Sequence, residues 1–142
     1  MSRLDTARPT VQAIITRLKA VLGMSAVWGS PARIYFGEAP QNAAFPFVVV
    51  SIQTTPSDTK SRVADDHTVR IQSFARATNS QSPADLALLS RETIINSLDR
   101  ATFAVTGASM VDCLQTGISD VFVEPDGETW QSIAEFAVRV TN

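Results

Sequence analysis

The sequence predicts one α+β domain spanning residues 1–142, built from a mainly antiparallel sheet with two helices packed on one face. Two segments repeat apolar residues at three- and four-residue spacing, which is typical of amphipathic helices. Five others alternate apolar and polar residues or concentrate β-branched ones, which indicates strands in the order α-β-β-β-α-β-β. Hairpin-type connections within each group of strands favour antiparallel pairing. No internal repeat or linker divides the chain.

The first helix is expected between Thr6 and Gly23. Thr6 is the expected N-cap, and Pro9 then falls in the first turn, where its missing N–H costs no intrahelical hydrogen bond. Gly23 provides a stop. The apolar face consists of Val11, Ile14, Ile15, Leu18, Val21 and Leu22.

Three strands follow this helix. Residues 33–36 suit a short strand, and residues 47–52 are rich in β-branched and aromatic side chains, as in a central strand. Residues 67–76 alternate, which puts Val69 and Ile71 on one face. The second and third of these strands form the predicted hairpin.

A polar connection, residues 55–66, joins the two hairpin strands and is about twice the usual median loop length. We expect its tip to extend past the sheet. It is the first candidate for a contact with another protein, and a solvated hairpin tip is the alternative. Its candidate contact residues are Asp58, Lys60, Arg62, Asp65 and Asp66.

The second helix is expected to begin at Ser82, whose hydroxyl can cap it, and to end near Arg100. Pro83 suits the first turn, and Asp85 favours the positive end of the helix dipole. Its expected buried face consists of Ala87, Leu88, Ile94, Ile95 and Leu98.

Two further strand-like stretches complete the chain. Residues 111–123 contain Gly117, where we expect a bend or break, and residues 129–140 show clear alternation. Glu124-Pro125-Asp126-Gly127 joins the two as a turn.

Composition excludes several classes of protein. The charge balance, 12 − 14 = −2, lacks the basic footprint of a nucleic-acid-binding domain. A single cysteine, Cys113, cannot form an internal disulfide or a thiolate metal cluster, which fits a reducing compartment. No apolar run is long enough to span a bilayer, and charged residues and Pro9 interrupt the N-terminal stretch where a signal peptide would need an apolar core.

The search for reactive groups predicts no catalytic, cofactor-binding or metal-binding residue. His67 is the single histidine, and we expect it to be a hydrogen-bonded residue at a sheet edge. Cys113 is expected to be a small core residue. The pairs Asp65–Asp66 and Asp126/Glu128 lack the spacing of a calcium loop. No nucleophile elbow or phosphate-binding glycine loop occurs.

Trp28 lies in a segment flanked by glycine and proline, and it is the candidate interface aromatic. A tryptophan in such a loop can fill a pocket of a neighbouring protein. The alternative is that Trp28 covers the core of its own chain.

Three blocks together resemble the tail-completion, or tail-terminator, family of long-tailed bacteriophages. They are Arg-Ile-Tyr-Phe-Gly-Glu-Ala-Pro at 33–40, Ala-Phe-Pro-Phe-Val-Val-Val at 44–50, and His-Thr-Val-Arg-Ile-Gln-Ser-Phe at 67–74. Phe47 replaces the more usual Tyr, and Ala75 stands where a Ser is common. The first helix, the polar loop and the second helix occur in the order that the family shows.

The resemblance implies a structural protein and not an enzyme. Family members form a ring, usually six-fold, that caps the tail tube, stops its polymerisation and joins it to the neck at the head–tail joint of the virion. The implied partners are further copies of the chain, the tail tube protein and a neck or head-completion protein, with DNA passing through the lumen without specific binding and no membrane involved. Assembly would take place in the bacterial cytoplasm.

Two alternatives stay open at this point. The chain can be another neck or minor tail protein built on the same scaffold. It can also be a small α+β ligand-binding module or enzyme with a site between helices and sheet.

Overall fold

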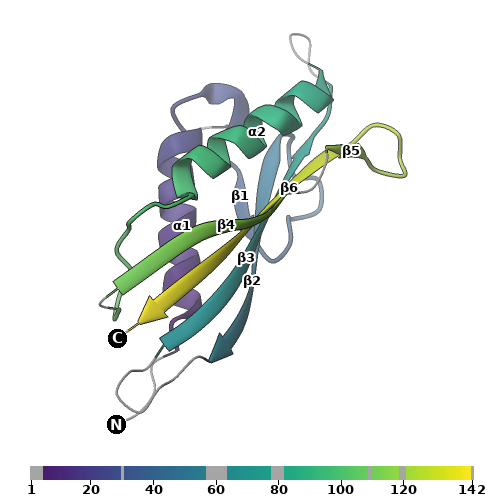
Figure 1. Ribbon diagram of the computed structural model, residues 1–142. Coiled ribbons are helices and arrows are strands. Elements are labelled where there is room, and N and C mark those ends of the chain that lie inside the picture. Colours follow the sequence, from purple (N-terminus) through teal and green to yellow (C-terminus); the bar gives the residue numbers. More distant parts are fainter. Residues whose placement is uncertain are drawn as a thin grey trace.

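The computed structural model describes residues 5–29, 31–56, 64–77, 82–108, 110–118 and 121–141. Two helices cover one face of a six-stranded sheet, as the sequence predicts (Figure 1). The helices are α1 (Ala7–Leu22) and α2 (Pro83–Leu98), with a single 3₁₀ turn, η1 (Ala26–Trp28), between α1 and the sheet. The strands are β1 (Ile34–Phe36), β2 (Phe47–Pro56), β3 (Ala64–Ala75), β4 (Met110–Ile118), β5 (Phe122–Val123) and β6 (Trp130–Thr141).

The strand order is β1-β2-β3-β6-β4, and β5 pairs with β6 beyond the end of β4. All pairs are antiparallel except β1 and β2, which are parallel. Two parallel strands cannot be joined by a tight turn, so the chain between β1 and β2 forms a crossover. Phe45, in this crossover, packs against Phe47 on the face of the sheet away from the helices. The guanidinium of Arg33 donates to the carbonyls of Val27, Phe45 and Pro46 and so fixes the crossover's return to the sheet.

The core lies between the helices and the sheet. Residues at every second position of β3 and β6 point toward the helices, because successive side chains of a strand alternate between faces. Phe136 at the centre of β6 is fully buried. The side chains that close this core are Ile14, Leu18 and Leu22 of α1, Ile94 and Leu98 of α2, Val48 and Val50 of β2, Val69 and Ile71 of β3, and Ala134, Val138 and Val140 of β6.

Both predicted helix starts are confirmed, but only one uses the predicted cap. The Ser82 hydroxyl accepts a hydrogen bond from the Asp85 N–H at 3.2 Å. Thr6 occupies the N-cap position of α1 without a capping hydrogen bond, because its hydroxyl is engaged by β3. Gly23 follows the last residue of α1 as expected, with right-handed φ and ψ angles.

The buried face of α2 agrees with the prediction in part, since Ala87, Ile94 and Leu98 are buried and Ile95 is half-buried. Leu88 is 45% exposed, and Leu86 is fully buried instead. Ser90 and Ser97 occupy the buried face, and Ser90 accepts a hydrogen bond from the Trp28 indole N–H at 2.9 Å. Apolar periodicity cannot detect buried serines, and this is why the sequence misses part of the face.

The second half of the sheet confirms the predicted bend. The register between β4 and β6 shifts between Gln115 and Gly117. In the turn after β5, one carboxylate oxygen of Asp126 accepts from the N–H groups of Glu128 and Thr129 at 2.8 and 2.9 Å. Gly127 has a φ of 73°, which favours glycine at that turn position.

Candidate interaction surface

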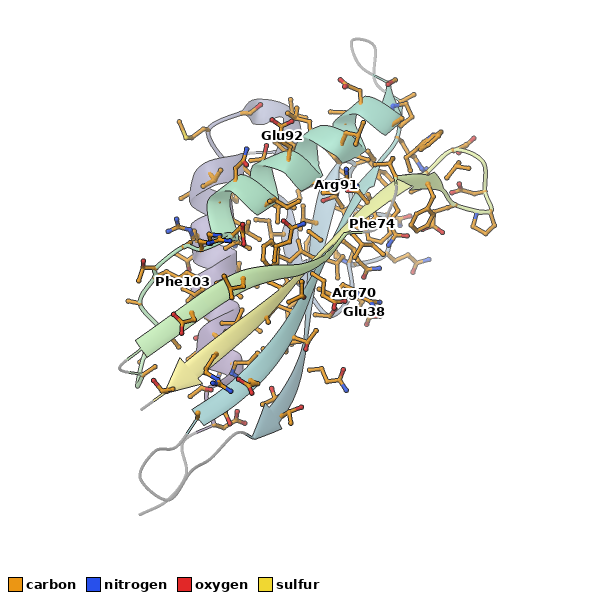
Figure 2. All side chains as sticks on the ribbon, in the orientation of Figure 1. Glu38, Arg70, Phe74, Arg91, Glu92 and Phe103 are labelled. Carbon is orange, nitrogen blue, oxygen red and sulfur yellow. The ribbon has the colours of Figure 1, made fainter. Side chains whose placement is uncertain are left out.

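The helices of the described residues cover one face of the sheet, and Figure 2 shows Arg70 and Phe74 on the other side, which we call the open face. The register places the side chains of paired strands in rows across this face. One end of the open face is aromatic and the other is charged. Its side chains include Tyr35 of β1, Phe47, Val49, Ser51 and Gln53 of β2, Asp66, Thr68, Arg70, Gln72 and Phe74 of β3, and Ile133, Glu135, Ala137 and Arg139 of β6.

The aromatic end is built around Phe47. Its ring centroid lies 6.0 Å from that of Tyr35, 5.0 Å from that of Phe45 and 5.1 Å from that of Phe74. The guanidinium carbon of Arg76 lies 4.4 Å above the Phe45 ring. Aromatic pairs of this kind add about 0.5–1.5 kcal/mol each beyond area burial. Phe47 itself is buried, so the partly exposed rings of Tyr35, Phe45 and Phe74 form the surface at this end.

Cross-strand ion pairs lie at the other end of the open face and in its middle. The Asp66 carboxylate accepts two hydrogen bonds from Arg139, at 2.8 and 3.1 Å, and these bonds raise the pKa of the Arg139 guanidinium. Arg70 and Glu135 lie 3.4 Å apart in the middle of the sheet. All four side chains are partly exposed, so the pairs add little stability and leave a surface of mixed charge available for contact.

A buried polar cluster ties the start of α1 to the sheet. The Thr6 hydroxyl donates to the Asp65 carboxylate at 2.6 Å and lies 2.9 Å from His67 Nε2. Since its single proton goes to Asp65, the Thr6 oxygen accepts from Nε2–H. His67 Nδ1 then accepts from the Thr54 hydroxyl at 2.8 Å. Burial lowers the pKa of His67, and the charge of Asp65 opposes this shift in part.

This cluster holds the residue types of a catalytic triad, but its geometry is structural. A triad needs the hydroxyl proton to be directed at the histidine and the hydroxyl to reach a substrate. Here Thr6 directs its proton to Asp65, and Thr6, Asp65 and His67 are each less than 5% exposed. His67 lies in β3, an inner strand of the sheet, so its expected place at a sheet edge is wrong, while its hydrogen bonding is as predicted.

The hairpin residues divide into three groups. Asp58, Lys60 and Arg62 lie outside the described residues. Asp65 and Asp66 belong to β3 and not to the connection, because pairing with β2 continues as far as Pro56 opposite Asp65. Asp65 is buried against the helices, and Asp66 lies on the open face.

Trp28 lies in the core of its own chain, 3% exposed. This position corresponds to the alternative in which Trp28 covers its own core. We do not retain it as a candidate interface residue.

The sheet edges hold exposed apolar residues that the sequence analysis missed. Phe36 at the end of β1 is 58% exposed, and Leu114 of β4 is 49% exposed. Phe122 and Val123, the two residues of β5, are 40% and 44% exposed. The sequence did contain one signal for these exposed residues. The apolar pair Phe122–Val123 lies next to the Glu124–Gly127 turn, and a strand of two residues can bury little of its apolar surface.

Sites for other ligands were also sought among the described residues. Within them, no group of three or more His, Cys, Asp or Glu side chains is arranged to hold a metal ion. None of the helices formed by these residues has both the length and the apolar character needed to cross a membrane. Burial raises the pKa of the Cys113 thiol to about 11, which makes it a poor nucleophile.

The fold and these surfaces define an α+β domain whose distinctive features are an open sheet face and two unlike sheet edges. Residues 12–141 match the family described as Tail completion protein gp17. The chain therefore belongs to this phage tail-completion family, and the resemblance found in the sequence is confirmed.

A solved structure supports the fold assignment. The chain is similar to a protein in the virion of a native gene transfer agent particle, with a TM-score of 0.79 and 15% sequence identity. The alignment covers 96% of this chain and 98% of that one. At this identity the likeness establishes the shared fold. No curated protein matches the chain significantly.

Proposed function

We propose that this protein is a tail terminator, a ring-forming subunit that caps a phage-type tail tube and stops its growth. The observation that carries the proposal is the family match over residues 12–141. The similarity to a protein of a gene transfer agent virion over nearly its whole length supports a place in a virion. The proposed ring contains six copies of the chain.

The mechanism is geometric and makes or breaks no covalent bond. A ring closes when two different patches on each subunit meet head to tail through a rotation that returns to the start. One side of the ring matches the end of the tube, and the other offers a surface on which tube subunits cannot add. The aromatic and charged ends of the open face supply two chemically different surfaces within one subunit.

The proposed partners are further copies of this chain, the tail tube protein and a neck or head-completion protein. The protein would be assembled in the bacterial cytoplasm and lie at the head–tail joint of the finished particle. The formal charge of −2 on each subunit is compatible with DNA passing through the ring without binding.

Deleting the gene tests this proposal, with tails examined by negative-stain electron microscopy. We expect overlong tails without heads, and complementation with the intact gene should restore their length. Tails of normal length that fail to attach heads would instead assign the protein to the neck. Normal particles with full infectivity or transfer would overturn both assignments and reopen the ligand-binding alternative.

A further inference from the structure

In the part of the chain that the structure describes, the outer edge of β2 is free over half of its length. β1 pairs with β2 only at Val48–Val50, so among the described residues β2 has no strand partner on this side from Ile52 onward. The Val48 N–H donates to the Arg33 carbonyl at 2.9 Å, and Val50 O accepts from Gly37 at 2.8 Å. By the two-residue period of a strand, the main-chain groups of Ile52 and Thr54 point to the same edge.

An apolar groove of about 430 Å³ runs beside this free edge. Val11 and Ile15 of α1 form one wall, and Phe36 and Ile52 form the other. Phe36 is 58% exposed at the end of the groove. A free strand edge next to an apolar groove is the arrangement that accepts an extended peptide, since the main chain provides hydrogen bonds and the groove takes alternate side chains.

At the opposite edge of the sheet, the short strand β5 also directs main-chain groups outward. The Glu124 N–H donates to the Thr129 carbonyl at 2.7 Å, so the main-chain groups of Val123 point away from β6. The neighbouring edge of β4 is occupied in its middle. There the Arg100 N–H donates to the Cys113 carbonyl and Gln115 N–H to the Asp99 carboxylate, both at 2.8 Å.

The α1 side of the groove and the segment around β5 differ in net charge. Arg8 and Lys19 lie on the same face of α1 as Ile15, at helical spacing, and α1 contains no acidic residue. Asp5 also borders the groove and offsets one of these two positive charges; its carboxylate accepts the Ala7 N–H at 3.0 Å. Residues 122–128 contain three carboxylates and no basic residue. Asp126 is bound within its own turn and to Arg76, and the other two are Glu124 and Glu128.

We propose that β5 of one copy adds as a strand to the free edge of β2 in a second copy, next to Ile52 and Thr54. One of the two apolar side chains of β5 enters the groove, and Glu124 and Glu128 approach Arg8 and Lys19. The two patches differ and lie on opposite edges of the sheet, so the contact is head to tail and each subunit can repeat it. This inference rests on the proposed function, which supplies the second copy.

Engineered disulfides test the contact directly. In Phe36→Cys with Val123→Cys, the two cysteines of one subunit are separated by four strand spacings, roughly 19 Å, so any disulfide between them joins different copies. We expect a ladder of linked multimers from concentrated protein under mild oxidation and from assembled particles. The buried Cys113, with its raised pKa, should contribute no background.

The matched control is Leu89→Cys with Val123→Cys, because Leu89 is also exposed but lies on α2. We expect at most dimers, formed through identical cysteines, from this variant and from each single-cysteine variant. A ladder equally strong in the Leu89 control, or no ladder from the Phe36 pair in either preparation, overturns the proposed contact.

Charge exchange tests the orientation of the contact. We expect Arg8→Glu with Lys19→Glu, and separately Glu124→Lys with Glu128→Lys, to weaken self-association about tenfold in sedimentation velocity. Mixing the two variants should recover most of the loss, since their patches complement each other again. Loss without recovery, or no loss, overturns the assigned pairing of patches.

The outcomes separate this contact from the proposed function. Rings or capped tubes that persist without the Phe36–Val123 ladder leave the tail-terminator proposal standing and overturn the edge contact. Normal tails and attached heads after gene deletion overturn the proposed function itself, whatever the cross-linking shows.

Discussion

Asp65 and Asp66 are neighbours in β3, yet they lie on opposite faces of the sheet. Asp65 is 3% exposed, and its carboxylate accepts a hydrogen bond from the Thr6 hydroxyl beneath the helices. The carboxylate of Asp66 is partly exposed and pairs with Arg139 on the open face. Identical side chains one position apart therefore serve the fold in one case and the surface in the other. Alternation along the strand assigns these roles.

The largest expected difference in the free energy of unfolding between the two faces comes from a residue on the core face. Phe136→Ala removes a fully buried ring under the helices and should lower the free energy of unfolding by about 3–5 kcal/mol. Urea denaturation followed by circular dichroism measures it. Leu114→Ala, at a 49% exposed position of β4, is the control and should change stability by less than about 1 kcal/mol. Equal losses would contradict the division into a core face and an open face.

Removing the buried carboxylate should give the next largest effect. Asp65→Ala leaves the Thr6 hydroxyl without its acceptor and should cost about 1–3 kcal/mol in the free energy of unfolding. Asp66→Ala, its matched control on the open face, should cost about 0–1 kcal/mol. A larger loss from Asp66→Ala than from Asp65→Ala in the same denaturation experiment would reverse the assignment of the two residues.

The buried cluster should also make stability depend on pH. Burial lowers the pKa of His67 in the folded state below the ordinary value of 6.5, so the unfolded chain takes up a proton first as pH falls. Stability should therefore be greatest above about pH 6.5 and should decrease as pH drops below it toward the folded-state pKa.

His67→Gln keeps a donor and an acceptor at this position but cannot titrate. Thermal melts from pH 5 to 7 should show a shallower decline for this variant than for the unaltered protein. An identical decline in both proteins would place the titrating group elsewhere.

The smallest expected effect on stability is at Asp66. Asp66→Lys should change the free energy of unfolding by less than about 1 kcal/mol and yet reduce particle assembly, because it places a cation beside Arg139 on the open face. Particle counts and tail lengths by electron microscopy measure assembly. Glu92→Lys, on α2, is the control for a charge change away from the open face (Figure 2). Normal assembly with Asp66→Lys would remove this residue from the contact surface.

Local patterns predicted most elements correctly because their causes are local. The Ser82 cap and the turn at Asp126 follow from side chains that bind main-chain groups within a few residues, and the bend lies at the glycine where the sequence placed it. The parallel pairing of β1 was not predictable in this way, since it depends on Arg33 binding carbonyls more than ten residues away. The buried face of α2 likewise includes Ser90, whose hydroxyl accepts a hydrogen bond from the distant Trp28 indole.

The sequence by itself determined the element order, the face of each long strand and the family, because periodicity and turn chemistry depend on residues close together in the chain. Only the tertiary structure decided that Asp65, His67 and Thr6 form one buried cluster and that, among the described residues, the outer edge of β2 beyond Val50 has no strand partner. The buried cluster depends on segments that are distant in the sequence coming together, and the free edge depends on β1 ending before its partner β2. Packing of the whole chain decides both.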